Sequence, residues 1–123
     1  MIKKRSVLYC EKCKTVLEVL SCFKESDCCN KNMKVLVEKN KEVSSEKHVP
    51  IITKIKEGYK VVIGNKLHPM DEDHYIQWIE LLEKDFSQIK FLKPGDDPIA
   101  IFKTDSKNIH VRSYCNIHGL WKS

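Results

Sequence analysis

The chain is organised around one stretch near its end, Tyr114-Cys115-Asn116-Ile117-His118-Gly119-Leu120-Trp121. It places a thiol and an imidazole three positions apart on a turn that Gly119 closes. At this spacing both Cys115 and His118 can reach one metal ion. Two ligands do not complete a site, so the stretch predicts that further ligands come from distant parts of the chain.

Two upstream segments supply the other candidate ligands. They are Glu46-Lys47-His48-Val49-Pro50 and His68-Pro69-Met70-Asp71-Glu72-Asp73-His74, each flanked by strand-like or turn-forming residues rather than by a long amphipathic helix. A single histidine in a small β-protein is more often a surface or hydrogen-bonded core residue than a ligand. Combined with the C-terminal pair, however, these segments offer four imidazoles and one thiolate, which predicts one metal centre. His110 matches no motif and is expected to be an ordinary histidine that binds no metal.

The N-terminal cysteines follow a pattern typical of a metal knuckle. Cys10-Glu11-Lys12-Cys13 lies between the strand-like residues 6–9 and 15–20, and a further strand is expected at 33–37. The adjacent cysteines Cys28 and Cys29 follow at the distance seen in zinc ribbons. Four thiolates around one ion form a tetrahedral site, which indicates zinc or a single iron.

This N-terminal pattern leaves alternatives open. Adjacent side chains of an extended chain point to opposite sides, so Cys28 and Cys29 can share a metal only where the backbone bends. A structural zinc and a disulfide between these two neighbours are the alternatives to iron. Cys22 is an additional thiol that could replace a ligand or remain apart.

Length, charge and cysteine count narrow the class of protein. A chain of 123 residues is one domain, or one domain with a small metal-stapled module. A net charge of +5 with scattered lysines suits a small anion and does not indicate nucleic acid. No apolar run approaches the roughly 20 residues of a membrane helix, and residues 1–5 lead straight into a strand-like segment. We therefore expect a cytoplasmic protein, with no membrane partner, whose six cysteines serve metal or redox chemistry in a reducing or anaerobic setting.

The remainder of the chain predicts a β-sandwich. The polar, aperiodic residues 38–45 mark a boundary after the cysteine module. β-Branched and aromatic residues separated by turn signals then predict short strands at 49–55, 59–63, 99–102 and 109–114. Residues 75–82 fit either a helix or a strand buried on both faces.

Several motifs, in order along nearly the whole chain, resemble desulfoferrodoxin, the two-iron superoxide reductase family. They are residues 46–50, 68–70, His74-Tyr75-Ile76-Gln77-Trp78-Ile79-Glu80-Leu81, Phe91-Leu92-Lys93-Pro94-Gly95-Asp96 and 114–121. The resemblance implies a mainly β protein: a desulforedoxin-like iron module with a rubredoxin-type knuckle at 1–37, then an immunoglobulin-like β-sandwich at 38–123. It also favours a strand at 75–82.

The resemblance further implies two irons per chain. The first would be bound by Cys10, Cys13, Cys28 and Cys29, and the catalytic one by His48, His68, His74 and His118 in a plane with Cys115 axial and the sixth position open. Lys47 matches a pocket lysine that attracts superoxide and organises a proton-donating water. Glu46 matches a carboxylate that closes onto the oxidised iron. The implied activity is one-electron reduction of superoxide to hydrogen peroxide by a homodimer, with electrons from a small redox protein such as rubredoxin.

Two other functions stay open at this stage. One is a zinc-ribbon-type binding module without catalysis, which the Cys-Cys spacing supports but which leaves the four histidines unexplained. The other is a one-iron superoxide reductase that has lost the N-terminal iron, because Lys14 and Asn30 stand where the family has glycine and Cys22 is additional. Metal content and colour distinguish these possibilities.

Overall fold

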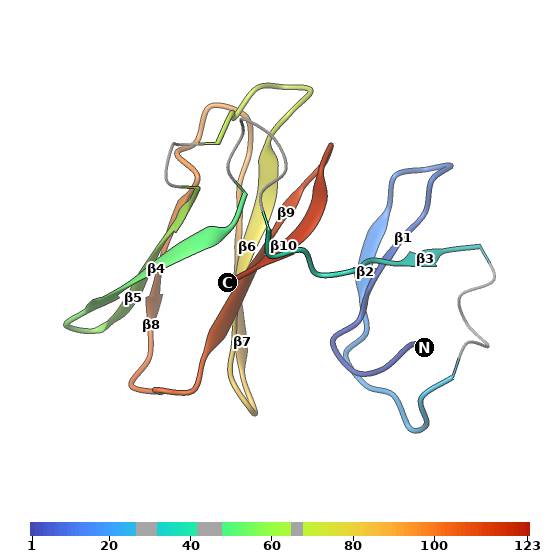
Figure 1. The fold of residues 1–123 in the computed structure, drawn as a ribbon, viewed down its shortest axis with the longest axis horizontal. Helices are drawn as coiled ribbons and strands as arrows, with labels where there is room; N and C mark the ends of the chain where they lie inside the picture. Colours follow the sequence, from blue (N-terminus) through green and yellow to red (C-terminus); the bar gives the residue numbers. More distant parts are fainter. Residues whose placement is uncertain (27–31, 42–47, 65–67) are drawn as a thin grey trace. The chain divides into compact units, whose positions relative to one another are not determined.

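The computed structural model describes residues 1–26, 32–41, 48–64 and 68–123, and it divides into two compact units, Met1–Val37 and Glu38–Ser123 (Figure 1). All the regular elements within these residues are β-strands. The described part of the chain contains no helix long and apolar enough to cross a membrane.

The first unit is built on a small antiparallel sheet with the strand order β2-β1-β3. Its strands are β1 (Val7–Tyr9), β2 (Val16–Glu18) and β3 (Lys34–Val35). Val7 and Leu8 in the central strand are buried together with Ile2, which pairs with Ser26 in an isolated bridge. The three strands expected around the cysteines are therefore present, although shorter than the sequence pattern suggests.

The second unit consists of two antiparallel sheets that face each other (Figure 1). One sheet has the order β10-β9-β6-β7 and the other β4-β5-β8. The strands are β4 (Pro50–Ile55), β5 (Gly58–Ile63), β6 (Ile76–Leu82), β7 (Ser87–Phe91), β8 (Ile99–Lys103), β9 (His110–Cys115) and β10 (Gly119–Lys122). This is the immunoglobulin-like β-sandwich that the resemblance predicts.

The core fills the space between the two sheets. Alternate residues of each strand point inward, as period 2 requires, so Val61 and Ile63 of β5 meet Ile79 and Leu81 of β6 in one buried cluster. Cys115 at the end of β9 belongs to the same cluster. The candidate ligand is therefore part of the packed interior.

Strand β6 resolves the ambiguity at residues 75–82. It lies between β9 and β7, and Ile76, Ile79, Leu81 and Leu82 are at most 1% exposed. Burial on both faces removes the apolar alternation that identifies a strand from sequence. This is why the pattern alone could not distinguish it from a helix.

Two strands of the sandwich are not among those the sequence pattern predicts. Strand β7 is an exposed edge strand with large apolar residues such as Phe91 facing solvent, so it lacks a buried alternating pattern. Strand β10 begins at Gly119, immediately after the ligand turn, and pairs with β9 from Gly119 opposite Cys115. Both strands depend on pairing with a neighbour rather than on their own composition.

Candidate metal centre

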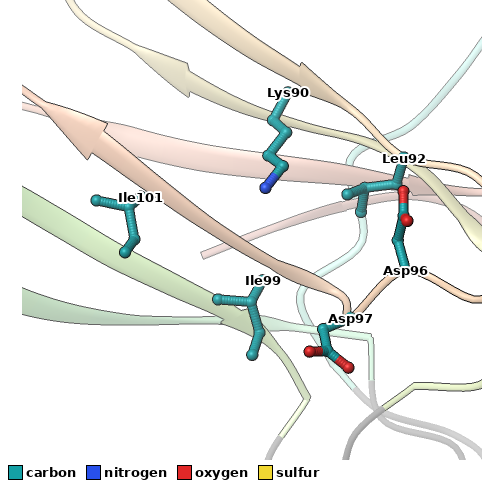
Figure 2. Close-up of a pocket in the computed structure, with 6 residues that line it drawn as sticks. All are labelled: Lys90, Leu92, Asp96, Asp97, Ile99 and Ile101. Atoms are coloured by element: carbon teal, nitrogen blue, oxygen red, sulfur yellow. The ribbon is translucent and has the colours of Figure 1, made fainter.

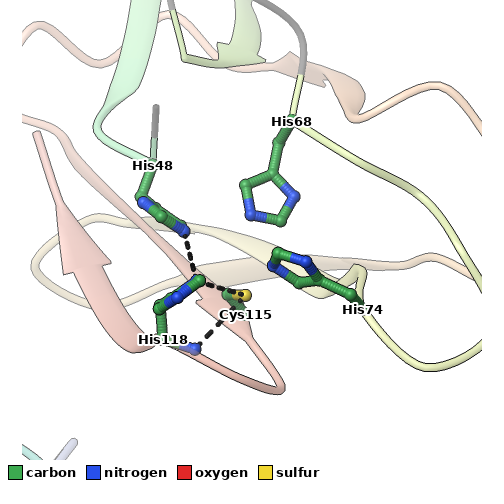
Figure 3. Close-up of side chains that lie close together, drawn as sticks. All are labelled: His48, His68, His74, Cys115 and His118. Carbon is green, nitrogen blue, oxygen red and sulfur yellow. Dashed lines mark hydrogen bonds between the residues drawn. The ribbon is translucent and has the colours of Figure 1, made fainter. Parts of the chain in front are cut away.

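Five side chains from three distant segments meet at one end of the sandwich. The candidate donor atoms of His48, His68, His74, Cys115 and His118 all lie within 4.8 Å of one another (Figure 3). His48, His68 and Cys115 are at most 3% exposed, and the other two are partly buried. The five residues that sequence reasoning singled out as one centre are thus brought together.

The four imidazoles form a closed circuit, in which each ring lies beside the next and the last lies beside the first. The ring centroids are 4.6 Å apart for His48 and His68, 4.9 Å for His68 and His74, 5.1 Å for His74 and His118, and 4.7 Å for His118 and His48. Each ring therefore has two imidazole neighbours, and the Cys115 thiol lies close to the circuit (Figure 3). This arrangement can surround a single ion.

The turn between β9 and β10 fixes the thiol and one imidazole. Gly119 has φ of +85°, a conformation in which a side chain is strained, and this lets the chain reverse within the few residues after Cys115. The His118 amide then points to Cys115 Sγ at 3.4 Å, and His118 Nδ1 is 3.8 Å from the same sulfur. An amide N–H directed at a thiolate stabilises its charge.

His48 immediately precedes β4 and is held from two sides. Its ring stacks on Trp121 of β10, with centroids 4.5 Å apart and planes 11° from parallel. Its Nε2 lies 3.0 Å from His118 Nδ1, and its carbonyl oxygen accepts from Ser113 Oγ at 3.4 Å. Trp121 thus forms a wall of the site.

The segment from His68 to His74 bends so that both of its histidines face the cluster. His68 Nδ1 is 2.7 Å from the Pro69 carbonyl oxygen. Because a carbonyl can only accept, Nδ1 carries the proton, and Nε2 presents the lone pair that a metal needs. His74 is fixed by reciprocal backbone hydrogen bonds with Asp71 of 2.9 and 3.2 Å.

Asn116 joins two of the ligand segments, and sequence reasoning did not assign it this role. Its Oδ1 accepts from the Tyr75 amide at 2.9 Å, and its Nδ2 donates to the Asp73 carbonyl at 3.0 Å. The side chain therefore clamps the backbone on both sides of His74 to the turn after Cys115. Its position between two ligands was the available signal, because asparagine readily bonds nearby backbone groups.

The chemistry of the donor set fits a transition metal. Imidazole suits zinc, copper, iron and nickel, and thiolate adds a soft ligand. Five protein donors exceed the four of a closed tetrahedral zinc site, and they leave one position free if the metal is six-coordinate. Iron bound here would supply one-electron chemistry, and His48, His68, His74, Cys115 and His118 are the residues that would hold it.

The first unit contributes a cysteine knuckle. The Lys14 amide donates to the Cys10 carbonyl at 2.8 Å and the Cys10 amide to the Thr15 carbonyl at 3.0 Å. Lys14 has φ of +63°, so it adopts a left-handed conformation. The family that the sequence resembles has glycine at this position. A hydrogen bond with the Thr15 side chain, above all, lowers the pKa of Cys13, which favours the thiolate form that binds metals.

Some predicted residues lie outside the described part of the chain. These are Cys28, Cys29 and Asn30 of the first unit, and Glu46 and Lys47 next to His48. Cys22 is described: its thiol donates to the Lys24 carbonyl at 3.1 Å.

A separate groove of about 470 Å³ lies between β7 and β8 (Figure 2). It is lined by Lys90, Leu92, Asp96, Asp97, Ile99 and Ile101. None of these residues belongs to the histidine–cysteine cluster.

Comparison with known proteins places the chain in a family. The family model described as Desulfoferrodoxin matches residues 40–123. A desulfoferrodoxin from Desulfarculus baarsii is 48% identical over 124 residues, covering 100% of this chain and 98% of that protein. The crystal structure of the superoxide reductase from Treponema pallidum covers 97% of this chain and 99% of that one, with a TM-score of 0.70 at 22% identity, and so supports the fold.

A second solved structure matches a smaller part of the chain. The superoxide reductase (1Fe-SOR) from Giardia intestinalis has a TM-score of 0.56 at 29% identity and covers 64% of this chain and 96% of that chain. The family model, the near full-length relative, the shared fold and the donor cluster all lead to the same assignment. The chain belongs to the desulfoferrodoxin family.

Proposed function

We propose that this protein is a superoxide reductase whose catalytic iron is bound by His48, His68, His74, His118 and Cys115. The observation that carries the proposal is the convergence of these five donors within 4.8 Å. Membership of the desulfoferrodoxin family and the names of the superoxide reductases it resembles support the substrate. The reaction combines superoxide with one electron and two protons to give hydrogen peroxide.

Each donor has a physical role in this reaction. Neutral imidazoles add no charge, so ferrous iron with one thiolate keeps a net positive charge that attracts an anion. Bound iron would supply the transferred electron. The Cys115 thiolate would donate electron density to that iron, and the four imidazoles would keep it high-spin, so that peroxide is released with its O–O bond intact. Lys47 would attract superoxide and organise a proton-donating water, and Glu46 would close onto the oxidised site after product release.

We further propose that the first unit carries a second iron on Cys10, Cys13, Cys28 and Cys29. The knuckle around Cys10 and the lowered pKa of Cys13 support metal binding there. This iron would receive electrons from a small redox protein such as rubredoxin. The active form would be a homodimer, as the resemblance implies, and the sequence pattern favours a cytoplasmic location.

The decisive experiment measures metal content and stoichiometry together. Iron and zinc are determined on protein produced with both metals, and superoxide consumption is compared with peroxide release in the presence of an electron donor. Reduction yields one peroxide per superoxide, whereas dismutation yields one per two. Zinc in both sites and no peroxide above the uncatalysed yield would contradict the proposal and favour a zinc-binding module.

Cys13→Ser should remove the N-terminal iron while leaving the single-turnover reaction with superoxide at the parent rate. The tetrahedral thiolate site of the first unit would lose an essential ligand, whereas the cluster of the second unit is built entirely from other residues. Iron content should fall by about half if each unit binds one ion. A Cys13→Ser protein with unchanged iron content would show that Cys13 is no ligand.

Lys47→Ala should slow the encounter with superoxide by roughly 3–10-fold at low ionic strength. The reason is the loss of the cation to which the resemblance assigns the attraction of superoxide, so the rate should also depend less on salt. Stopped-flow kinetics between low and high salt measure both effects. Lys60→Ala, which removes an exposed lysine from β5, is the matched control. Equal rates for Lys47→Ala and this control would show that Lys47 does not attract superoxide to the site.

A further inference from the structure

Lys39 lies beside the strand that follows the ligand turn, and its backbone is fixed there. Its amide donates to the Leu120 carbonyl at 2.9 Å, and its carbonyl accepts from the Lys122 amide at 2.8 Å. It forms a parallel bridge with Trp121. These bonds use only backbone atoms, so any residue other than proline at this position should keep the segment in place.

The Lys39 ammonium reaches back to the metal centre. Its Nζ donates to the His118 carbonyl oxygen at 2.9 Å. The same oxygen accepts from Trp121 Nε1 at 3.1 Å, and Nζ lies 5.5 Å from the centroid of the Trp121 ring. Since Trp121 stacks on His48, one ammonium contacts the backbone of one candidate ligand and the aromatic wall of another.

We propose that Lys39 is a positioning residue of the metal centre that also raises the reduction potential of the bound metal. This rests on the proposed function, which places iron at the cluster. Fixing the His118 carbonyl restrains the turn that carries Cys115 and His118, because the carbonyl belongs to that turn. Holding the Trp121 ring keeps its stacking on His48 in place.

The sign of the electrostatic effect follows from the charges. A nearby cation disfavours the ferric ion more than the ferrous ion, so the Lys39 ammonium favours the reduced state. The side chain is exposed, so solvent and salt screen this interaction and it is modest. Removing the charge should lower the reduction potential and decrease the ratio of ferrous to ferric protein at a fixed potential by about 2–5-fold.

The chain offers a matched control. The Lys54 ammonium lies 4.7 Å from the centroid of the Tyr59 ring, so it makes the same kind of cation–π contact in the same unit. None of the five clustered ligands is in that pair. Lys54→Met therefore removes the same charge and the same kind of contact as Lys39→Met, without touching the ligand turn.

The test compares the parent protein with Lys39→Met, Lys39→Arg and Lys54→Met, all loaded with iron. Redox titration at low and high salt gives the potential of the thiolate-bound iron, whose charge-transfer band identifies it. Lys39→Met should lower the potential, with a smaller difference at high salt. Lys39→Arg should restore most of it, because a guanidinium can donate to the same carbonyl and stack on the same ring. Lys54→Met should resemble the parent.

A second readout needs neither iron nor activity. In zinc-loaded protein, the indole N–H resonance of Trp121 should shift and exchange faster with solvent in Lys39→Met, while that of Trp78 stays unchanged. A parent protein that binds no iron or reduces no superoxide would overturn the proposed function. The comparison of zinc-loaded proteins would still test whether Lys39 positions the ligand turn and Trp121. An unchanged potential together with an unchanged Trp121 resonance in Lys39→Met would overturn the inference alone.

Discussion

Cys115→Ser should abolish the reaction with superoxide, with a rate at least about 100-fold below the parent, because changes in the residues around metal ligands already cost 10–100-fold. A serine hydroxyl is a harder and weaker donor than a thiolate for this kind of centre. Replacing the thiolate would remove its electron donation to the bound iron. Stopped-flow kinetics and the loss of the thiolate-to-iron absorption band measure the change.

The fold should tolerate this substitution. Cys115 is fully buried in the core cluster, but serine is smaller and leaves the backbone pairing of Cys115 with Gly119 intact. Cys22→Ser makes the same chemical change in the first unit, where the thiol donates to the Lys24 carbonyl. It should keep the parent rate. Retention of the absorption band and of superoxide reactivity in Cys115→Ser would show that the thiol does not bind the catalytic metal.

Arg112→Met should destabilise the second unit by about 3–5 kcal/mol, the typical cost of breaking a buried ion pair from one side. Arg112 Nε donates to Glu80 Oε1 at 2.6 Å, and Nη1 donates to Glu38 Oε1 at 3.0 Å. Arg112 and Glu80 are 2% and 0% exposed and face each other across β9 and β6. Without the guanidinium, the Glu80 carboxylate stays buried but loses the positive charge of Arg112.

Urea unfolding followed by tryptophan fluorescence measures this loss. Both tryptophans, Trp78 and Trp121, lie in the second unit, so the signal reports on that unit. Replacing Glu80 by leucine in the same protein should recover most of the stability, because it removes the buried charge whose ion pair with Arg112 has been lost. Lys103→Met removes a partner of the exposed Glu57 pair at 3.8 Å and should change stability by at most about 1 kcal/mol.

The consequence of this ion pair extends to the metal centre. Glu38 immediately precedes Lys39, and its carboxylate is anchored by Arg112. The ion pair therefore helps to hold the segment from which the Lys39 ammonium reaches the His118 carbonyl. We expect Arg112→Met to weaken that contact even in protein that remains folded.

The stability prediction has its own control. If Arg112→Met and Lys103→Met have equal unfolding free energies, the buried pair does not stabilise the fold.

The sequence by itself determined the features that depend on local pattern. Alternating apolar residues and turn signals identified most strands, and the three-residue spacing of Cys115 and His118 identified a ligand pair. The order of motifs along the chain led to the family. Each of these signals is contained in short stretches, where strand periodicity and turn chemistry act.

Tertiary structure alone decided the contacts around the centre that no motif predicts. The Asn116 clamp, the buried pair of Glu80 and Arg112, and the reach of Lys39 to the ligand turn all join residues far apart in the chain. The exposed edge strand β7 and the short β10 likewise exist through pairing with neighbours. The physical reason is that these contacts arise from the packing of two sheets and the register between their strands, which no single stretch of sequence encodes.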